Sequence, residues 1–192
     1  MSDDLTYSYK AALFSAPWEF QLKEEGLEWH AGRHSGLLRY DHIRCVRLSF
    51  RPVTLQSHRF LAEIWSEGVP KILIASTTWR SIIEQKRQDE GYAAFIIELH
   101  RRIAVAGVPA QFLIGMPGIV YWLGLAVFVA VGLGLAALTV RALQVEEWAG
   151  AAFVGGFFAL FVWQLGGYFR RNRPETYRPD KLPASLLPRA KT

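Results

Sequence analysis

The sequence predicts an α+β membrane protein: a small antiparallel β domain with one C-terminal amphipathic helix, followed by a two-helix transmembrane hairpin. Two observations lead to this class. Residues 15–80 contain short segments rich in β-branched and aromatic residues between turn residues, as in small antiparallel strands. Residues 117–140 and 148–169 contain no charged residue, and each run reaches the roughly 20 apolar residues that cross a bilayer.

Five segments of the β region carry the clearest strand pattern. In one of them Val46, Leu48 and Phe50 alternate with Arg47 and Ser49, and this period of two indicates a strand that is buried on one face. The expected strands are residues 18–23, 27–30, 43–50, 60–65 and 71–76.

One amphipathic helix follows the strands. Asp89 is suited to cap its start, and Gly107 and Pro109 are suited to end it. Apolar residues between these signals recur at helical spacing, which predicts that one face of the helix packs on the sheet. These residues are Tyr92, Phe95, Ile96, Leu99 and Ile103.

Local sequence features of this region resemble bacterial PH-like domains. They are Gly26-Leu27-Glu28-Trp29, the Gly32-Arg33 turn, residues 38–43 leading into Val46-Arg47-Leu48, and the closing Tyr92-x-x-Phe95-x-x-x-Leu99-His100-x-x-Ile103. The resemblance covers residues 15–107 and implies a strongly bent antiparallel barrel or sandwich that a C-terminal helix closes at one end. The basic motif of eukaryotic phosphoinositide-binding PH domains is not reproduced, so specific phosphoinositide binding is not expected.

The sequence divides into a PH-like domain at residues 1–110, a hairpin region at 111–169 and a basic, Pro-rich tail at 170–192. The spans are expected at 118–140 and 148–169, joined by an antiparallel turn. The tail resembles that of small proteobacterial membrane proteins whose function is unassigned. Its prolines forbid a regular helix, and its regularly placed apolar residues predict that it lies along a surface.

The charges that flank the spans predict their orientation. Under the positive-inside rule, basic residues outside the hairpin place both termini in the cytoplasm, with the protein in the inner membrane. Met1-Ser2-Asp3-Asp4 shows no signal peptide, which agrees with this topology. The flanking basic residues are Arg101, Arg102, Arg170, Arg171, Arg173, Arg178, Lys181, Arg189 and Lys191.

Small residues recur four apart inside the spans and let helix backbones approach closely. One interpretation is that the two helices pack on each other. The other is self-association or docking on a larger membrane complex. The residues are Ala126, Ala130 and Gly134 in the first span, and Ala151, Gly155 and Ala159 in the second.

No catalytic, cofactor or metal site is expected. The single cysteine, Cys45, cannot supply a cysteine-based metal set, and no phosphate-binding glycine loop or framed nucleophile is present. The spans contain no ionisable residue, which argues against a transporter acting alone. Nucleic acid is not an expected partner, because much of the net charge of +5 comes from the tail beside the membrane.

Basic residues are the candidate contacts with anionic headgroups or a protein partner. The alternative is a solvated strand face on which arginine stems cover apolar surface. The candidates are Arg33, Arg39, Arg44 and Arg47 in the strands, Arg101 and Arg102 in the helix, and Arg170, Arg171 and Arg173 after the second span; Arg51 and Arg59 lie in the same strand region.

The function expected from these features is that of a non-enzymatic, membrane-anchored binding or scaffolding module. Its PH-like domain would engage a protein partner or anionic headgroups at the cytoplasmic face. The alternative is an accessory subunit of a larger membrane complex, assembled through the hairpin. A third hypothesis, an enzyme, is not favoured, because no convergent polar residues with a chemical role can be assembled. The expected interactions are therefore with membrane lipids and with either a protein partner or a second copy of the chain.

Overall fold

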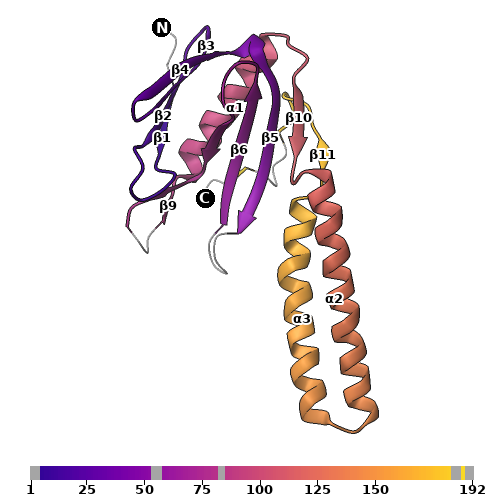
Figure 1. Cartoon of the computed structure of the whole chain (residues 1–192). Coiled ribbons are helices and arrows are strands. Elements are labelled where there is room, and N and C mark those ends of the chain that lie inside the picture. Colours follow the sequence, from indigo (N-terminus) through magenta and orange to yellow (C-terminus); the bar gives the residue numbers. More distant parts are fainter. Residues whose placement is uncertain (1–4, 53–57, 82–84, 183–186, 189–192) are drawn as a thin grey trace. The chain divides into compact units, whose positions relative to one another are not determined.

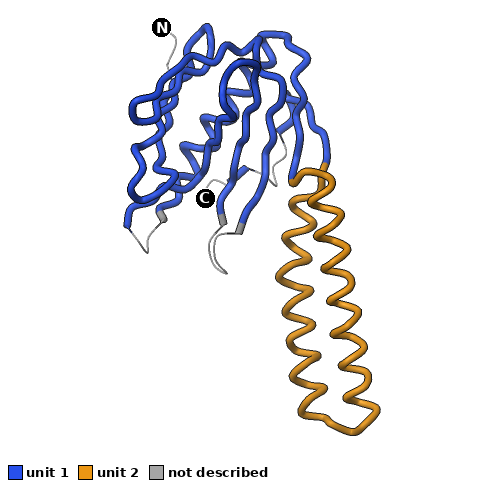
Figure 2. The backbone as a smooth tube through the Cα atoms, in the orientation of Figure 1, with its two compact units in different colours: residues 1–115, 175–192 blue, residues 116–174 orange. Residues whose placement is uncertain are grey.

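The chain folds as two compact units in the computed structural model, which describes residues 5–52, 58–81, 85–182 and 187–188 (Figure 2). The β unit joins residues 1–115 with 175–192, and the helical unit is residues 116–174. The β unit is therefore built from two stretches of chain that flank the helical unit in the sequence. Arg189 and Lys191, and the N-terminal residues 1–4, lie outside the described residues.

The first sheet of the β unit is an antiparallel meander. It contains β1 (Thr6–Tyr9), β2 (Trp18–Leu22), β3 (Gly26–Ala31) and β4 (His34–Arg39) in that order. Gly32 turns the chain between β3 and β4 with a φ of +63°, the left-handed region that glycine tolerates best. Inward-facing Phe20, Leu22, Leu27 and Leu38 are buried at 2% exposure or less, so this sheet presents an apolar face to the core.

The second sheet has the strand order β11-β10-β5-β6-β7. After the short helix η1 (Tyr40–His42) come β5 (Ile43–Pro52), β6 (His58–Ser66) and β7 (Ile72–Ala75), paired antiparallel. Later in the chain, β10 (Gln111–Ile114) pairs parallel with β5, and β11 (Glu175–Thr176) pairs antiparallel with β10. A separate ladder is formed by β8 (Thr77–Trp79) and β9 (Gln85–Arg87).

The expected strands are confirmed, and the antiparallel pairing of this region is as the alternation indicated. The strands that the sequence did not predict are β1, β4 and β8 to β11. The sequence also did not predict that β10 pairs with β5 in parallel, because the pattern of a four-residue segment does not indicate which distant strand it pairs with.

The helix α1 (Asp89–Val105) covers the core of the β unit (Figure 1). The five apolar residues that follow helical spacing are all buried, as predicted. Asp89 is the first helical residue and Gln88 is the N-cap, one position earlier than expected. Phe95 packs on Tyr7 and Phe20 with ring centroids 5.6 and 6.3 Å apart, and burying such a side chain contributes about 1.5–3 kcal/mol.

Two tyrosines of β1 connect the sheets at their edges. The Tyr7 hydroxyl donates to the Ala75 carbonyl at 2.6 Å, and the Tyr9 hydroxyl donates to the Leu73 carbonyl at 2.5 Å. Because both acceptors belong to β7, the first strand of one sheet lies against the last strand of the other.

The helical unit consists of α2 (Gly118–Gln144) and α3 (Trp148–Arg171). With 27 and 24 residues, both are long and apolar enough to cross a membrane. At 1.5 Å per residue they reach about 40 and 36 Å, against a hydrocarbon thickness of about 30 Å. Phe128 stacks on Phe161 at 5.1 Å between the helices. The first helix continues past Val140 through Gln144, so the connection is shorter than the charge pattern indicated.

Candidate functional site

The predicted basic residues of the strands lie at separate places on the β unit. Arg33 is exposed in the turn between β3 and β4. Arg39 at the end of β4 donates two hydrogen bonds to Asp41, at 3.0 and 2.9 Å. Arg44 at the start of β5 bonds to Glu67 at 2.8 Å. Arg39 and Arg44 are therefore neutralised by exposed ion pairs, which hold the pKa of each partner carboxyl below its usual value.

Arg47 has a different environment in the middle of β5. Its guanidinium lies 5.0 Å from the centre of the Trp65 ring, and Lys71 lies 5.5 Å from the same ring. Lys71 also bonds to the buried Glu63, which is the cross-strand partner of Arg47. Such cation–π contacts contribute about 0.5–1 kcal/mol at exposed sites, so this group of residues stabilises the outer face of the sheet.

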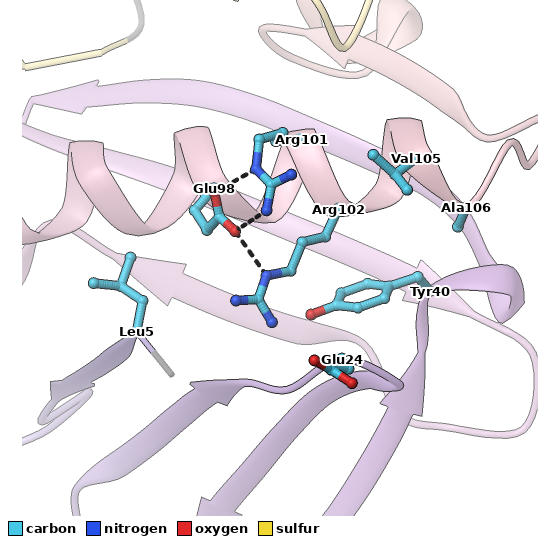
Figure 3. Close-up of a pocket in the computed structure, with 8 residues that line it drawn as sticks. All are labelled: Leu5, Glu24, Tyr40, Glu98, Arg101, Arg102, Val105 and Ala106. Atoms are coloured by element: carbon cyan, nitrogen blue, oxygen red, sulfur yellow. Dashed lines mark hydrogen bonds and ion pairs between the residues drawn. The ribbon is translucent and has the colours of Figure 1, made fainter. Parts of the chain in front are cut away.

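Arg101 and Arg102 are brought together by one carboxylate. Glu98, one turn earlier on α1, accepts hydrogen bonds from Arg101 at 2.6 and 2.7 Å and from Arg102 at 2.8 Å (Figure 3). The two guanidinium groups lower the pKa of Glu98 to about 2. Glu98 is therefore ionised at neutral pH and unsuited to act as a general acid.

These three residues line a groove of about 630 Å³ at the carboxyl end of α1 (Figure 3). Its walls combine apolar surface with two arginines and two glutamates, so its formal charge is balanced. The groove therefore offers apolar surface and charges of both signs within one cavity. The remaining lining residues are Leu5, Glu24, Tyr40, Val105 and Ala106.

The last predicted basic residues belong to the helical unit. Arg170 and Arg171 are exposed in the final turn of α3, and Arg173 is exposed just beyond it. Cations at this position also interact favourably with the carboxyl end of the helix. They lie at the end of the unit that is continuous with β11 of the β unit.

The small residues of the spans divide into two sets. Ala151 is buried, and a Cβ on Gly155 would lie 3.4 Å from the Thr139 methyl group, so these two positions face α2. In contrast, Ala126, Ala130, Gly134 and Ala159 are exposed in the helical unit. A Cβ on Gly134 would meet no described atom within 4 Å. The first set therefore lies at the contact between α2 and α3, whereas the second set forms exposed small-residue surface on the two helices.

A buried histidine and a tyrosine that returns from the hairpin form a clasp that the sequence did not reveal. His100 on α1 is 0% exposed; its Nδ1 donates to the Ile96 carbonyl, and its Nε2 accepts from the Tyr177 hydroxyl, each at 2.7 Å. The Tyr177 ring also packs on Phe112 of β10 at 5.6 Å. Burial lowers the pKa of His100 to about 4 and raises that of Tyr177, so both are neutral at pH 7.

Tail residues beyond the clasp also belong to the β unit. Leu182 and Leu187 pack against its core, together with Tyr177. Residues 183–186 and 189–192 of the predicted tail lie outside the described residues. The position of His100 within the apolar face of a helix was the one sequence feature that pointed to this contact. The sequence pattern did not indicate that Tyr177, 77 residues later, is its partner.

The described ranges, with their gaps, contain no group of three or more histidine, cysteine or carboxylate side chains that could hold a metal ion. The elements described above define a mixed α+β protein with antiparallel sheets and two helices long and apolar enough to span a membrane. No protein-family model, curated protein or solved structure matches the chain.

Proposed function

We propose that the protein is a non-enzymatic, membrane-anchored binding module of the inner membrane, with a PH-like β unit and both termini in the cytoplasm. The PH-like assignment is supported by the element order: a four-stranded antiparallel meander, a second sheet, and the closing helix α1. The groove of Figure 3 and the basic residues of the β unit are the surfaces available to a protein partner or to anionic headgroups.

The pairing of β10 with β11 is the observation that carries the proposal. Leu113 lies opposite Thr176 and Ile114 opposite Glu175, and these strands are the two connections to the helical hairpin. Both ends of the hairpin are thus fixed in one folded unit and belong to one side of any membrane that it crosses. The positive flanks favour the cytoplasmic side.

The energetics of insertion support an anchor. Leucine, isoleucine, phenylalanine and valine each favour insertion by about 0.3–0.6 kcal/mol at a helix centre, whereas a charged residue opposes it by about 2.5–3.5 kcal/mol. Residues 118–140 of α2 and 148–169 of α3 contain no charged residue. Each helix therefore has a net preference for the bilayer.

Alkaline carbonate extraction combined with reporter fusions tests this function. A reporter that is active only in the cytoplasm should be active after Thr192 and inactive when inserted in the connection at residues 145–147. The protein should stay in the membrane pellet after extraction. Release by carbonate, or activity of the reporter in the connection, would refute the anchored topology.

The outward-facing small residues favour a second candidate, an accessory subunit that assembles through the hairpin. Ala126, Ala130 and Gly134 lie away from α3, so packing within the hairpin does not account for them. Close approach of another helix along this stripe would use them. On this hypothesis Ala130→Leu should reduce the size of the complex purified in mild detergent. An unchanged elution volume would count against assembly through the stripe.

A further inference from the structure

Arg51 and Arg59 are direct cross-strand neighbours on the outer face of the second sheet. They follow the inward-facing pair Phe50 and Phe60, whose buried rings lie 5.6 Å apart in the core. Because side chains alternate along a strand, the two arginines extend from the opposite face. Directly opposite residues have Cβ atoms about 4.5–5.5 Å apart, a position at which like charges destabilise a sheet.

Among the described residues, this arginine pair has no ion-pair partner of the kind that Arg39 and Arg44 have. Within the described ranges neither Arg51 nor Arg59 forms an ion pair, whereas Arg39 and Arg44 are matched by Asp41 and Glu67. Arg59 is half-buried, and its Nε is enclosed without a hydrogen-bond partner among the described residues. Burial and the charge of Arg51 both lower the pKa of Arg59. The pair is therefore a cationic site that the described part of the chain leaves uncompensated.

A buried hydroxyl lies on the same face of β5. Ser49 is 3% exposed, and its Oγ has no hydrogen-bond partner among the residues that the structure describes. Ser49 is two residues before Arg51, so both side chains extend from the outer face. Buried polar groups are ordinarily hydrogen-bonded, so this end of the β5–β6 face has polar capacity that the described chain does not use.

The register places the pair at the end of the sheet where the chain leaves for the hairpin. Ile114, the last residue of β10, lies beside Leu48, and the Gly115 N–H donates to the Leu48 carbonyl at 2.7 Å. Arg51 is three residues further along β5, about 10 Å at 3.3 Å per residue. The apolar helix α2 begins at Gly118. Within the β unit, Figure 1 shows β5 and β10 pointing to this same end.

We propose that Arg51 and Arg59 bind the phosphate of an anionic phospholipid headgroup in the membrane that the hairpin spans. Guanidinium groups bind phosphate oxygens through paired, charge-assisted hydrogen bonds, and a phosphate between two arginines would relieve their repulsion. Residues 115–117 reach at most about 10 Å, so the end of β10 stays close to the start of the membrane helix. This inference rests on the proposed membrane anchoring and names the headgroup site within it.

The test compares the full chain in nanodiscs of phosphatidylcholine alone and of phosphatidylcholine with phosphatidylglycerol. Urea unfolding of the β unit is followed by tryptophan fluorescence. The anionic lipid should raise the folding equilibrium constant of the unsubstituted protein roughly 25-fold, because each of the two arginines near an anionic surface contributes roughly fivefold. The Arg51→Gln/Arg59→Gln variant should lose this gain, and should be no less stable than the unsubstituted protein in phosphatidylcholine alone.

Two further variants keep the test specific. Arg51→Gln alone removes an exposed side chain and should lose part of the gain even if the double variant does not fold. Lys23→Gln removes one positive charge from the turn between β2 and β3, where Lys23 pairs with Glu28 at 2.8 Å, and should retain the gain. A gain that is absent from the unsubstituted protein, or that persists in Arg51→Gln and the double variant, would overturn the headgroup site.

Two further measurements distinguish a lipid headgroup from free phosphate, and the headgroup site from membrane anchoring itself. Inorganic phosphate added to phosphatidylcholine discs should give no comparable gain; an equal gain would assign the pair to free phosphate and overturn the lipid assignment. Co-elution of every variant with the discs reports on anchoring by the hairpin. Loss of the unsubstituted protein from the discs would refute the proposed function and, with it, the inference. Retention without a lipid-dependent gain would refute the inference alone.

Discussion

The helical unit is built from contacts between sequence neighbours, whereas the β unit depends on contacts between residues far apart in the chain. α2 and α3 are joined by three residues and pack along their lengths, as the stacked Phe128 and Phe161 illustrate. In the β unit, β10 pairs with β5, and Tyr177 bonds to His100 although the whole hairpin lies between them in the sequence. The helical unit is therefore determined locally, while the β unit is complete only after the hairpin has been made.

Tyr177→Ala tests the long-range side of this comparison and should have the largest effect. It removes ring packing on His100 and Phe112 and leaves His100 Nε2 without its partner. We expect a loss of about 3–5 kcal/mol in the free energy of unfolding of the β unit, measured by urea titration in detergent micelles. Tyr177→Phe keeps the ring and should lose only about 1–2 kcal/mol. Equal midpoints for Tyr177→Ala and the unsubstituted protein would contradict the clasp.

The pH dependence of stability tests the same clasp through its histidine. Burial lowers the pKa of His100 from 6.5 to about 4, so the unfolded chain binds the proton more tightly than the folded chain. The neutral, buried His100 therefore contributes fully to the free energy of unfolding above pH 6.5. This contribution is lost as the pH falls toward 4, by about 3 kcal/mol in total. Urea midpoints between pH 7 and 4.5 should show this slope, and His100→Gln should remove it. An identical slope in the variant would mean that other groups cause it.

Gly155→Leu tests the local side of the comparison and should have the smallest effect. The new side chain would meet Thr139 across the helix pair and overpack the hairpin. We expect a loss of about 1–3 kcal/mol, measured as the SDS fraction at which the helices separate in mixed micelles. Ala152→Leu on the exposed face of α3 is the matched control and should leave this midpoint unchanged. Equal losses in both variants would show that Gly155 is not special to the interface.

The sequence predicted those elements that carry their own periodicity. The apolar stripe of α1 and the five expected strands were recognisable because burial on one face imposes a period of 3.6 or 2. The candidate basic residues were recognisable only by type. Sequence spacing could not tell Arg39 and Arg44, which are neutralised by Asp41 and Glu67, from Arg51 and Arg59, which lie opposite each other. Cross-strand neighbours depend on register, which a single sequence does not specify.

The sequence by itself determined the two apolar helices, because a run of about 20 uncharged residues has no other stable environment than a bilayer or a large core. It also determined the antiparallel strands and the buried face of α1, because periodic burial needs no knowledge of the partner. Only the tertiary structure decided that β10 and β11 pair, that Tyr177 meets His100, and that Ala151 and Gly155, rather than Ala130, face the neighbouring helix. These contacts join residues whose pairing depends on how the whole chain closes, and short segments carry no local signal of a distant partner.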